Sequence, residues 1–290
     1  PKNGRVKGLN EVSLDRTYST NVHKKIIFKL IGVFMTLTID IGNTTTNCGL
    51  FDGEKIVLQV RLTTNRNASS DEIGIFLRSS LRENGFDWKN VEKIGICSVV
   101  PSVNYSWSSA CSKYLGHDPL FIQAGIKTGL KLKFGNTKEI GADLIAAAMG
   151  AVAVKPDTDL IIVDMGTATT LEIVTKDREF MGGTILAGLK ISVEALATGT
   201  AKLPSVEIAK PEHACATNTI EAIQSGLYYG TAGAIKELCA QYQKSNFGGK
   251  KPYIIATGGF SKIFADCNLF DEIVPELVLS GVKCAIDLNL

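Results

Sequence analysis

The feature that most constrains this chain is a short polar motif that occurs twice. Residues 39–46 read Ile-Asp-Ile-Gly-Asn-Thr-Thr-Thr, and residues 163–170 read Val-Asp-Met-Gly-Thr-Ala-Thr-Thr. Each copy follows an apolar run and precedes a turn signal, at residues 52–53 and 176–178 respectively. Apolar runs bounded by turn residues predict a strand, a tight polar turn and a second strand. The repeat therefore predicts an α/β chain of two related halves that face each other, with one such turn from each half.

The residue types in each turn suit a phosphate group. Glycine lets the backbone approach a ligand closely, and Asn and Thr side chains supply hydrogen-bond donors. An acid at the end of the preceding strand, Asp40 or Asp164, can face a hydrated metal ion while the turn holds the phosphate. A single copy would be equally typical of an ordinary hairpin. Two copies with the same flanking pattern favour a pair of phosphate loops.

Helices and strands alternate along the rest of both halves. Ser69 and Glu72 have the spacing of a capping box, which predicts a helix that ends near residues 84–85. Further strands are expected over 94–100, 119–122, 159–164, 168–174, 179–185 and 253–256. Further helices are expected over 103–115 and 138–154, from residue 189 to about 197, over 219–242 and after 261. The second half is longer because it contains inserted helices, which could contact a substrate or a second subunit.

This pattern suggests three segments. Residues 1–34 are basic and are interpreted as an extension outside the core fold, residues 35–155 as the first α/β lobe, and residues 156–290 as the second lobe with its helical insertion. The apolar run at 26–34 is interrupted by Lys29 and weakened by Gly32, so no membrane span is expected.

Charge and cysteine usage narrow the function classes. The net charge is +2 over 290 residues, and no basic stripe with interleaved aromatic residues occurs, so a nucleic-acid-binding role is not expected. The seven cysteines show no metal-binding spacing, and their odd number favours reduced thiols in the cytoplasm. Cys48 and Cys97 lie in strand-like runs and are interpreted as small buried hydrophobic residues.

Two more stretches have both an ordinary and a functional interpretation. Asp143 lies near the start of an Ala-rich helix, where the helix dipole favours an acid whatever its function. It could instead be a carboxylate positioned beside the cleft between the lobes, although the residues alone favour the first interpretation. Thr257-Gly258-Gly259 is typical of a strand–helix turn and equally suits a backbone surface against which a nucleotide lies.

Taken in order, these motifs resemble those of the type III pantothenate kinases. The matching stretches are 40–44, 141–143, 164–169, 182–183 before 188–189, 218–226 and 257–259, and the likeness covers residues 35–290. The resemblance implies the fold of the acetate and sugar kinase, Hsp70 and actin superfamily, with ATP between two duplicated lobes. It also implies phosphorylation of pantothenate to 4′-phosphopantothenate, the first step of coenzyme A biosynthesis. The enzyme would be a cytoplasmic homodimer that uses Mg²⁺ or a similar divalent cation and K⁺ or NH₄⁺.

The resemblance also implies roles for individual residues. Asp143 would accept the proton of the pantothenate hydroxyl, Asp164 would bind the monovalent cation, and Asp40 would hold the divalent metal through water. The nucleotide-binding residues would be Asp40, Ile41, Gly42, Asn43, Thr44, Thr45, Thr46, Asn47, Thr167, Gly258 and Gly259. Pantothenate would be bound by Phe134, Gly141, Ala142, Asp143, Leu144 and Thr219, with Thr219 able to reach the site of a second subunit.

The chain departs from the family pattern at two places in the pantothenate site. The family usually has Arg after the Gly-Ala-Asp acid, where this chain has Leu144, and a Tyr near an Asn-Pro, where this chain has Phe134 and Asn136-Thr137. An Arg can pair bidentately with a carboxylate, and losing one charged contact costs about 1.5–3 kcal/mol, or about ten- to a hundredfold in affinity. Two alternatives therefore stay open: a nucleotide-binding accessory or regulatory homologue with little or no activity, and a related small-molecule kinase.

Overall fold

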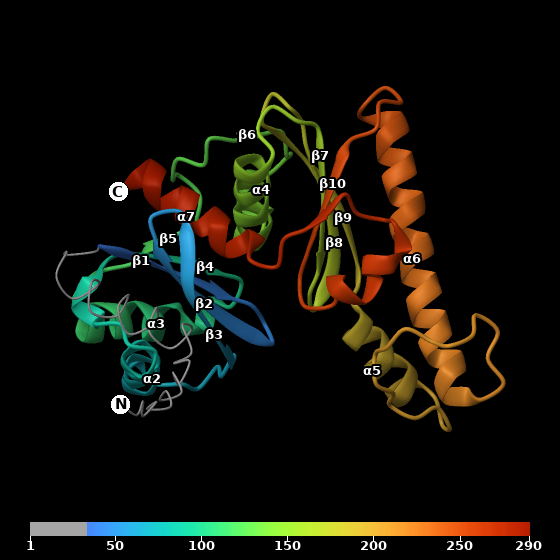
Figure 1. The fold of residues 1–290 in the computed structure, drawn as a ribbon, viewed down its shortest axis with the longest axis horizontal. Helices are drawn as coiled ribbons and strands as arrows, with labels where there is room; N and C mark the ends of the chain where they lie inside the picture. The colour runs from blue at the N-terminus through green and yellow to red at the C-terminus, as the bar shows by residue number, and fades with distance from the viewer. Residues whose placement is uncertain (1–33) are drawn as a thin grey trace, which may run out of the picture.

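The protein forms two α/β lobes, each built on its own sheet (Figure 1). The computed structural model describes residues 34–290, so all but the last residue of the predicted extension lies outside the described residues. The first sheet has the order β3-β2-β1-β4-β5. Its strands are β1 (Met35–Ile41), β2 (Thr45–Asp52), β3 (Lys55–Thr63), β4 (Val91–Ser98) and β5 (Leu120–Phe121).

The second sheet repeats this topology. Its order is β11-β10-β7-β8-β9-β6, formed by β6 (Lys131–Leu132), β7 (Leu160–Met165), β8 (Ala168–Val174), β9 (Glu179–Ala187), β10 (Tyr253–Thr257) and β11 (Glu272–Ile273). In both sheets the first three strands form an antiparallel meander, and two later strands add in parallel beside the first. The expected duplication of the lobes is therefore confirmed, with β6 as an extra edge strand.

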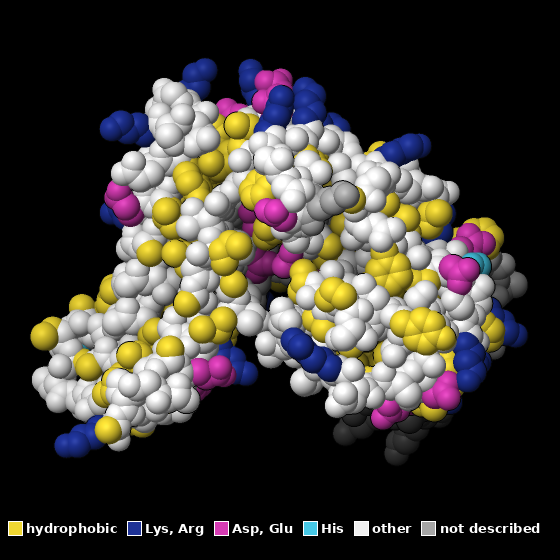
Figure 2. Space-filling model, turned by 180° about the vertical axis from the view of Figure 1, so that it is seen from behind, with side chains coloured by type: hydrophobic (Ala, Val, Ile, Leu, Met, Phe, Trp, Pro, Cys, Tyr) yellow, Lys and Arg dark blue, Asp and Glu magenta, His cyan; other side chains and the backbone are white. Residues whose placement is uncertain are grey.

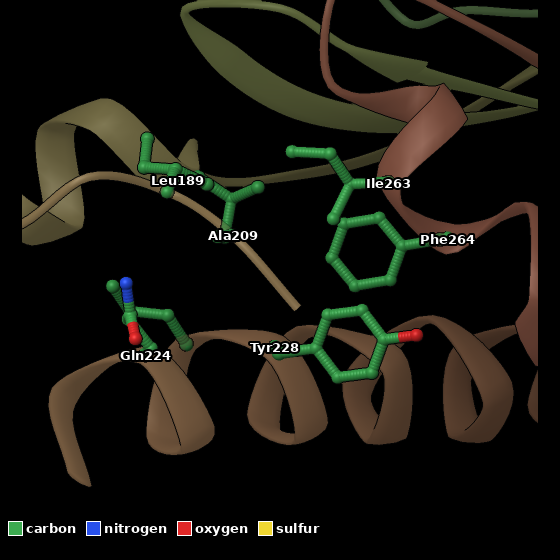
Figure 3. A pocket seen from close by; sticks show the side chains of 8 residues that line it. Leu189, Ala209, Gln224, Tyr228, Ile263 and Phe264 are labelled. Carbon is green, nitrogen blue, oxygen red and sulfur yellow. The ribbon is translucent and has the colours of Figure 1, made fainter. Parts of the chain in front are cut away.

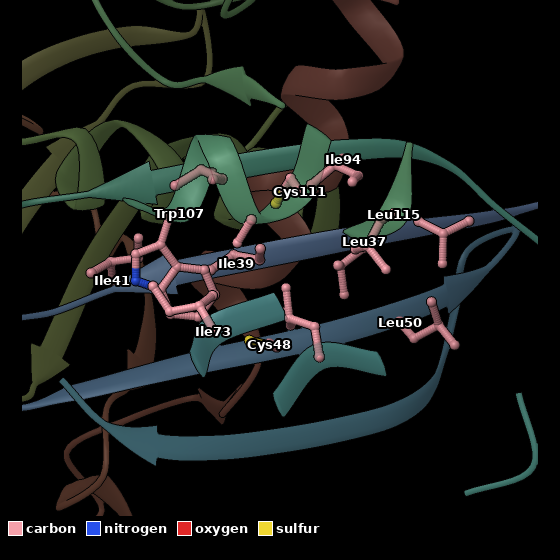
Figure 4. Close-up of a cluster of buried hydrophobic side chains, with 14 of the residues drawn as sticks. Leu37, Ile39, Ile41, Cys48, Leu50, Ile73, Ile94, Trp107, Cys111 and Leu115 are labelled. Atoms are coloured by element: carbon pink, nitrogen blue, oxygen red, sulfur yellow. The ribbon is translucent and has the colours of Figure 1, made fainter. Parts of the chain in front are cut away.

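The outer face of the first sheet is covered by α2 (Ser70–Glu83) and α3 (Asn104–Ala110). Side chains from β1, β2 and β4 interlock there with Trp107 of α3 and Ile73 of α2 (Figure 4). The predicted capping box is present: the Glu72 N–H donates to Ser69 Oγ, and the Ser69 N–H donates to Glu72 Oε2. This arrangement satisfies backbone donors that have no partner inside the helix, and it sets the start of α2.

Two helices, α4 (Ala142–Val154) and α7 (Leu277–Asn289), lie between the sheets and join the lobes (Figure 1). They pack so closely that a Cβ on Gly281 would lie 1.7 Å from the carbonyl oxygen of Ala146. α7 also packs on β1 and β4 of the first sheet, whereas α4 packs on β4 of the first sheet and on β7 and β8 of the second. The C-terminal end of the chain therefore returns to the first lobe, and the domain limits at 155 and 156 stay a prediction.

The insertion in the second half contains α5 (Leu189–Gly199), a segment without regular structure, and the long helix α6 (Thr219–Ser245). α6 covers the outer face of the second sheet, where Tyr228 and Ile235 pack with β7 and β8 (Figure 1). The helix expected after 261 is a 3₁₀ helix, Ser261–Cys267. All seven cysteines are free thiols, and Cys48 and Cys97 are buried as expected.

Candidate active site

The two copies of the motif meet in space. Each forms the turn of a hairpin, between β1 and β2 in the first lobe and between β7 and β8 in the second. The hydroxyl oxygens of Thr44 and Thr167 lie 3.1 Å apart, although they are separated by 123 residues in the chain. The expectation that two loops face each other across the lobes is therefore confirmed.

The two loops differ in length by one residue, which an ungapped comparison of the motifs does not show. Asp40 is paired in register with Asn47, whereas Asp164 is paired with Thr170. Beyond the loop, each residue of β8 therefore corresponds to a position of β2 one residue later than the sequence match suggests. Thr170 is the counterpart of Asn47 rather than of Thr46.

Two arginines that the sequence analysis missed support the first loop. Arg66 donates from Nη2 to Asn43 Oδ1 at 3.1 Å, and Arg61 donates from Nε to Asn47 Oδ1 at 2.8 Å. Asn47 in turn donates to Asp40 Oδ2 at 3.3 Å. Both guanidinium groups are exposed beside the loop, where they add the positive charge that a phosphate chain requires. The hairpin of β2 and β3 was expected, but its register, which places Arg61 opposite Asn47, was not.

Three carboxylates come together where the lobes meet: Asp40 at the end of β1, Asp164 at the end of β7 and Asp143 in the first turn of α4. The pKa of Asp40 is raised to about 7, mainly by burial; the hydrogen bond from Asn47 opposes the shift, and the nearby Asp164 and Asp143 contribute to it. Burial and then Asp143 raise the pKa of Asp164 to about 7. Among the described side chains none of the three acids forms an ion pair. Figure 2 shows acidic side chains in the hollow between the lobes.

Asp143 is held by the start of its own helix. Its Oδ1 accepts a hydrogen bond from the Leu144 N–H at 2.9 Å, and a Cβ on Gly141 would lie 2.3 Å from that oxygen. Burial raises the pKa of Asp143, against the lowering effect of backbone N–H groups. Its position is compatible with both interpretations, because Asp143 lies in the first turn of α4 and also interacts electrostatically with Asp40 and Asp164.

Gly258 packs directly against the acid of the second loop. Its φ is +86°, and a Cβ there would lie 2.4 Å from Asp164 Oδ1 and 2.5 Å from the Met165 carbonyl carbon. Gly259 is exposed and has no such neighbour within 4 Å. The first glycine of this pair is therefore needed for packing, and the second leaves an open backbone surface.

The residues expected at the pantothenate site are only partly assembled in one chain. The ring of Phe134 lies over Gly182 of β9, where an added Cβ would be 3.1 Å from the ring. Gly141, Ala142 and Asp143 are consecutive at the start of α4, and Leu144 packs against the apolar cluster around that helix. Thr219 is exposed at the first turn of α6, and no hydrogen bond or ion pair described here connects it to Asp143.

A buried acid that the sequence analysis overlooked lies on β8. Glu172 is 1% exposed, and its Oε1 accepts a hydrogen bond from Thr170 Oγ1 at 2.6 Å. Within residues 34–290 its Oε2 has no hydrogen-bond partner. Burial raises its pKa well above the usual range; the Thr170 hydrogen bond opposes this shift, and Asp164 and Asp143 add to it. An acid between Leu171 and Ile173 in a predicted strand was the signal that could have identified it.

The described residues fit a site where cations are shared with a phosphate ligand. Over residues 34–290, no group of three or more His, Cys, Asp or Glu side chains could hold a metal ion by itself. Buried carboxylates without a cationic partner are costly unless a cation neutralises them. Asp40 and Asp164 can each supply one carboxylate, with phosphate oxygens and water completing the coordination, as is usual for Mg²⁺ bound with nucleotides.

A separate, nearly filled hollow with essentially no room for a water molecule lies between α5, α6 and the Ser261–Cys267 helix (Figure 3). It is lined mainly by apolar groups, and Tyr228 and Phe264 stack there with ring centroids 5.0 Å apart. It contains no charged side chain, so we interpret it as part of the core of the second lobe rather than as the reaction site. None of the helices in residues 34–290 is both long and apolar enough to cross a membrane.

The repeated lobes and the facing loops with acids between them define a two-lobed α/β fold built on a duplicated sheet topology. Two solved structures share the architecture. A conserved putative Baf family transcriptional activator from Campylobacter jejuni has a TM-score of 0.54 and 20% identity, and the match covers 87% of this chain and 97% of that chain. A reductive activator for a corrinoid, iron-sulfur protein has a TM-score of 0.50 and 12% identity, and the match covers 87% of this chain and 60% of that chain. At these identities the likeness concerns the fold alone.

The chain belongs to the type III pantothenate kinase family, whose sequence model matches residues 36–241. A type III pantothenate kinase from Legionella pneumophila (strain Corby) is 49% identical over 255 residues, which cover 88% of this chain and 99% of that protein. A type III pantothenate kinase from Elusimicrobium minutum is 42% identical, and the match covers 88% of this chain and 99% of that protein. Type III pantothenate kinase 1 from Francisella tularensis is 44% identical, and the match covers 87% of this chain and 96% of that protein.

Proposed function

We propose that this protein catalyses the ATP-dependent phosphorylation of pantothenate to 4′-phosphopantothenate, the first step of coenzyme A biosynthesis. The observation that carries the proposal is the contact between the Thr44 and Thr167 hydroxyls, which brings two phosphate loops together beside Asp143. It is supported by membership of a family whose named relatives match nearly the full length of the chain.

Phosphoryl transfer requires a protein to position its substrates and to neutralise charge, with little covalent chemistry of its own. Residues 40–47 and Thr167 would hold the phosphates of ATP, and Arg61 and Arg66 stiffen the first loop and add positive charge to it. The exposed backbone at Gly259 would lie against the nucleoside, with Gly258 fixing the turn. Asp143 would orient the hydroxyl of the acceptor and take its proton, a role for which a raised pKa is favourable.

Two cations would bind at the acids of the loops. Asp40 would hold a divalent cation such as Mg²⁺ through water, and Asp164 would hold K⁺ or NH₄⁺. When bound, the cations spread the charge that develops on the transferring phosphoryl group. The raised pKa values of both carboxyls support this assignment, because nothing else among the described side chains neutralises them.

The acceptor site would be lined by Phe134, residues 141–144 and Thr219. Leu144 supplies no charge to the pantothenate carboxylate, so we expect weaker binding of this substrate than an Arg would give. Because Thr219 is exposed and remote in sequence and fold from α4, we propose that it reaches the site of a second subunit in a homodimer. Exposed apolar side chains on β9 and α6, Ile185 (70% exposed) and Ile220 (54%), support such an interface. The free cysteines support a cytoplasmic location.

A coupled assay of ADP formation tests the proposal. The full chain is incubated with ATP, Mg²⁺ and pantothenate in KCl or in NaCl, alongside a panel of sugars and short hydroxy acids. We expect ADP formation that depends on pantothenate and is stimulated by K⁺. ATP binding without ADP formation would favour the accessory role that Leu144 keeps open, and activity with a sugar or short acid only would identify a related kinase.

A further inference from the structure

The two loop acids, Asp40 and Asp164, differ in their side-chain hydrogen bonds with the neighbouring strand. In the first lobe Asn47 donates a hydrogen bond to Asp40. The counterpart of Asn47 in the second lobe is Thr170, which is paired in register with Asp164. Thr170 has one hydroxyl hydrogen, and it goes to Glu172 Oε1 at 2.6 Å. Among the described residues no side chain donates to Asp164, so Thr170 offers that acid only the lone pairs of its oxygen.

Glu172 has a hydrogen-bond donor for only one of its two carboxylate oxygens among the described residues. It lies on the same face of β8 as Thr170, because residues two apart in a strand point to the same side. Its Oε2 is buried and has no hydrogen-bond partner in the part of the chain that the structure describes. Register places Glu172 diagonally from Asp164 across the strand pair, at a Cβ separation of about 7–8 Å or somewhat less, which long side chains can bridge. A buried oxygen without a partner calls for a specific explanation, such as a water molecule or an ion.

We propose that Thr170 and Glu172 complete the oxygen cage of the monovalent cation at Asp164. Thr170 would be a ligand through its hydroxyl oxygen. Glu172 would orient that hydroxyl by accepting its hydrogen and would present its second carboxylate oxygen to the cation. Two carboxyl groups and a hydroxyl oxygen whose hydrogen is already donated face one another on one side of the hairpin. A shared cation would stabilise all three. This inference rests on the proposed function, in which Asp164 binds that cation.

A purely structural Glu172 is the competing explanation, and the variant Glu172→Gln separates the two. Glutamine keeps the acceptor for Thr170 but removes the acid from beside Asp164. If Glu172 only locks Thr170 in place, the variant changes the melting temperature by the same amount at every K⁺ concentration. If Glu172 serves the cation, the variant is at least as stable as the wild type without K⁺ and gains less from added K⁺.

The test is thermal unfolding of the full chain over a KCl series, with choline chloride keeping the ionic strength constant, in the presence and absence of ADP and Mg²⁺. We expect Glu172→Gln and Thr170→Val to raise the K⁺ concentration of half-maximal stabilisation by about tenfold or more, the usual effect of one lost contact to a charged group. Thr38→Val is the matched control. It removes a buried strand hydroxyl that donates to Gly49 in the other lobe, and it should leave that midpoint unchanged.

Wild-type K⁺ midpoints in both Glu172→Gln and Thr170→Val would overturn the inference, as would a loss of stability in Glu172→Gln that is the same at every K⁺ concentration. Asp164→Asn distinguishes this failure from failure of the cation site itself. If Asp164→Asn abolishes the response to K⁺ while the other two variants keep it, only the roles of Thr170 and Glu172 are wrong. If Asp164→Asn keeps the response, or the wild type has none, the proposed site at Asp164 is wrong and the inference fails with it.

Discussion

The variant Gly258→Ala tests how tightly the acid of the second loop is packed. The new Cβ would lie 2.4 Å from Asp164 Oδ1, 2.5 Å from the Met165 carbonyl carbon and 2.6 Å from the Met165 nitrogen. Two of these neighbours are backbone atoms of Met165, the last residue of β7, so no side-chain rotation can relieve the contact. The backbone at residue 258 also has a φ of +86°, which an L-residue rarely adopts.

The two penalties add up to a measurable loss of stability. A left-handed backbone costs alanine about 1–2 kcal/mol, and forcing an extra carbon into a packed region costs about 1–3 kcal/mol. We therefore expect the free energy of unfolding to fall by about 2–5 kcal/mol. For a protein of this size, each 1 kcal/mol lost from the free energy of unfolding lowers the melting temperature by about 2–4 °C. The expected decrease is therefore roughly 4–20 °C.

Gly259→Ala is the matched control, because that position is exposed and has no neighbour within 4 Å of the new carbon. Its melting temperature should stay close to that of the wild type. Differential scanning calorimetry of the two variants and the wild type, without nucleotide, measures the comparison. Equal melting temperatures for Gly258→Ala and the wild type, or an equal loss in both variants, would show that the close approach to Asp164 does not constrain this turn.

Three further predictions concern the acceptor site and the joint between the lobes. Asp143→Asn should bind ATP like the wild type, which calorimetric titration measures. Its kcat should fall by about 10²-fold or more in a coupled assay of ADP release, and an unchanged kcat would remove Asp143 from the mechanism. Leu144→Arg should lower the KM for pantothenate by about ten- to a hundredfold, with Leu144→Met as the control of similar size, and an unchanged KM would place the substrate carboxylate elsewhere. Gly281→Ala should destabilise the protein by about 1–3 kcal/mol or more in urea unfolding, because its Cβ would lie 1.7 Å from the Ala146 carbonyl oxygen. Ser280→Ala, one residue earlier on α7, adds no atom and should change stability by less than about 1 kcal/mol; similar losses in both variants would count against a tight contact between α4 and α7.

Local sequence determined a large part of this protein. The doubled motif predicted two related lobes with facing loops, and the structure confirms both through the repeated strand order and the Thr44–Thr167 contact. The capping pair Ser69 and Glu72 predicted the start of α2 correctly. These features were predictable because each depends on residues a few positions apart: turn chemistry, strand alternation and helix caps act over short stretches of chain.

Only the tertiary structure decided how these pieces meet. Because the loops differ by one residue, the counterpart of Thr170 in the first lobe is Asn47 and not Thr46, and only this register shows that Glu172 lies near Asp164. The return of α7 to the first sheet was not anticipated from its own residues, because its contacts are with β1, β4 and α4, which precede it by more than 100 residues. Strand register and helix packing are selected by the burial of surfaces from distant segments, so a pattern read along the chain predicts the elements but not their partners.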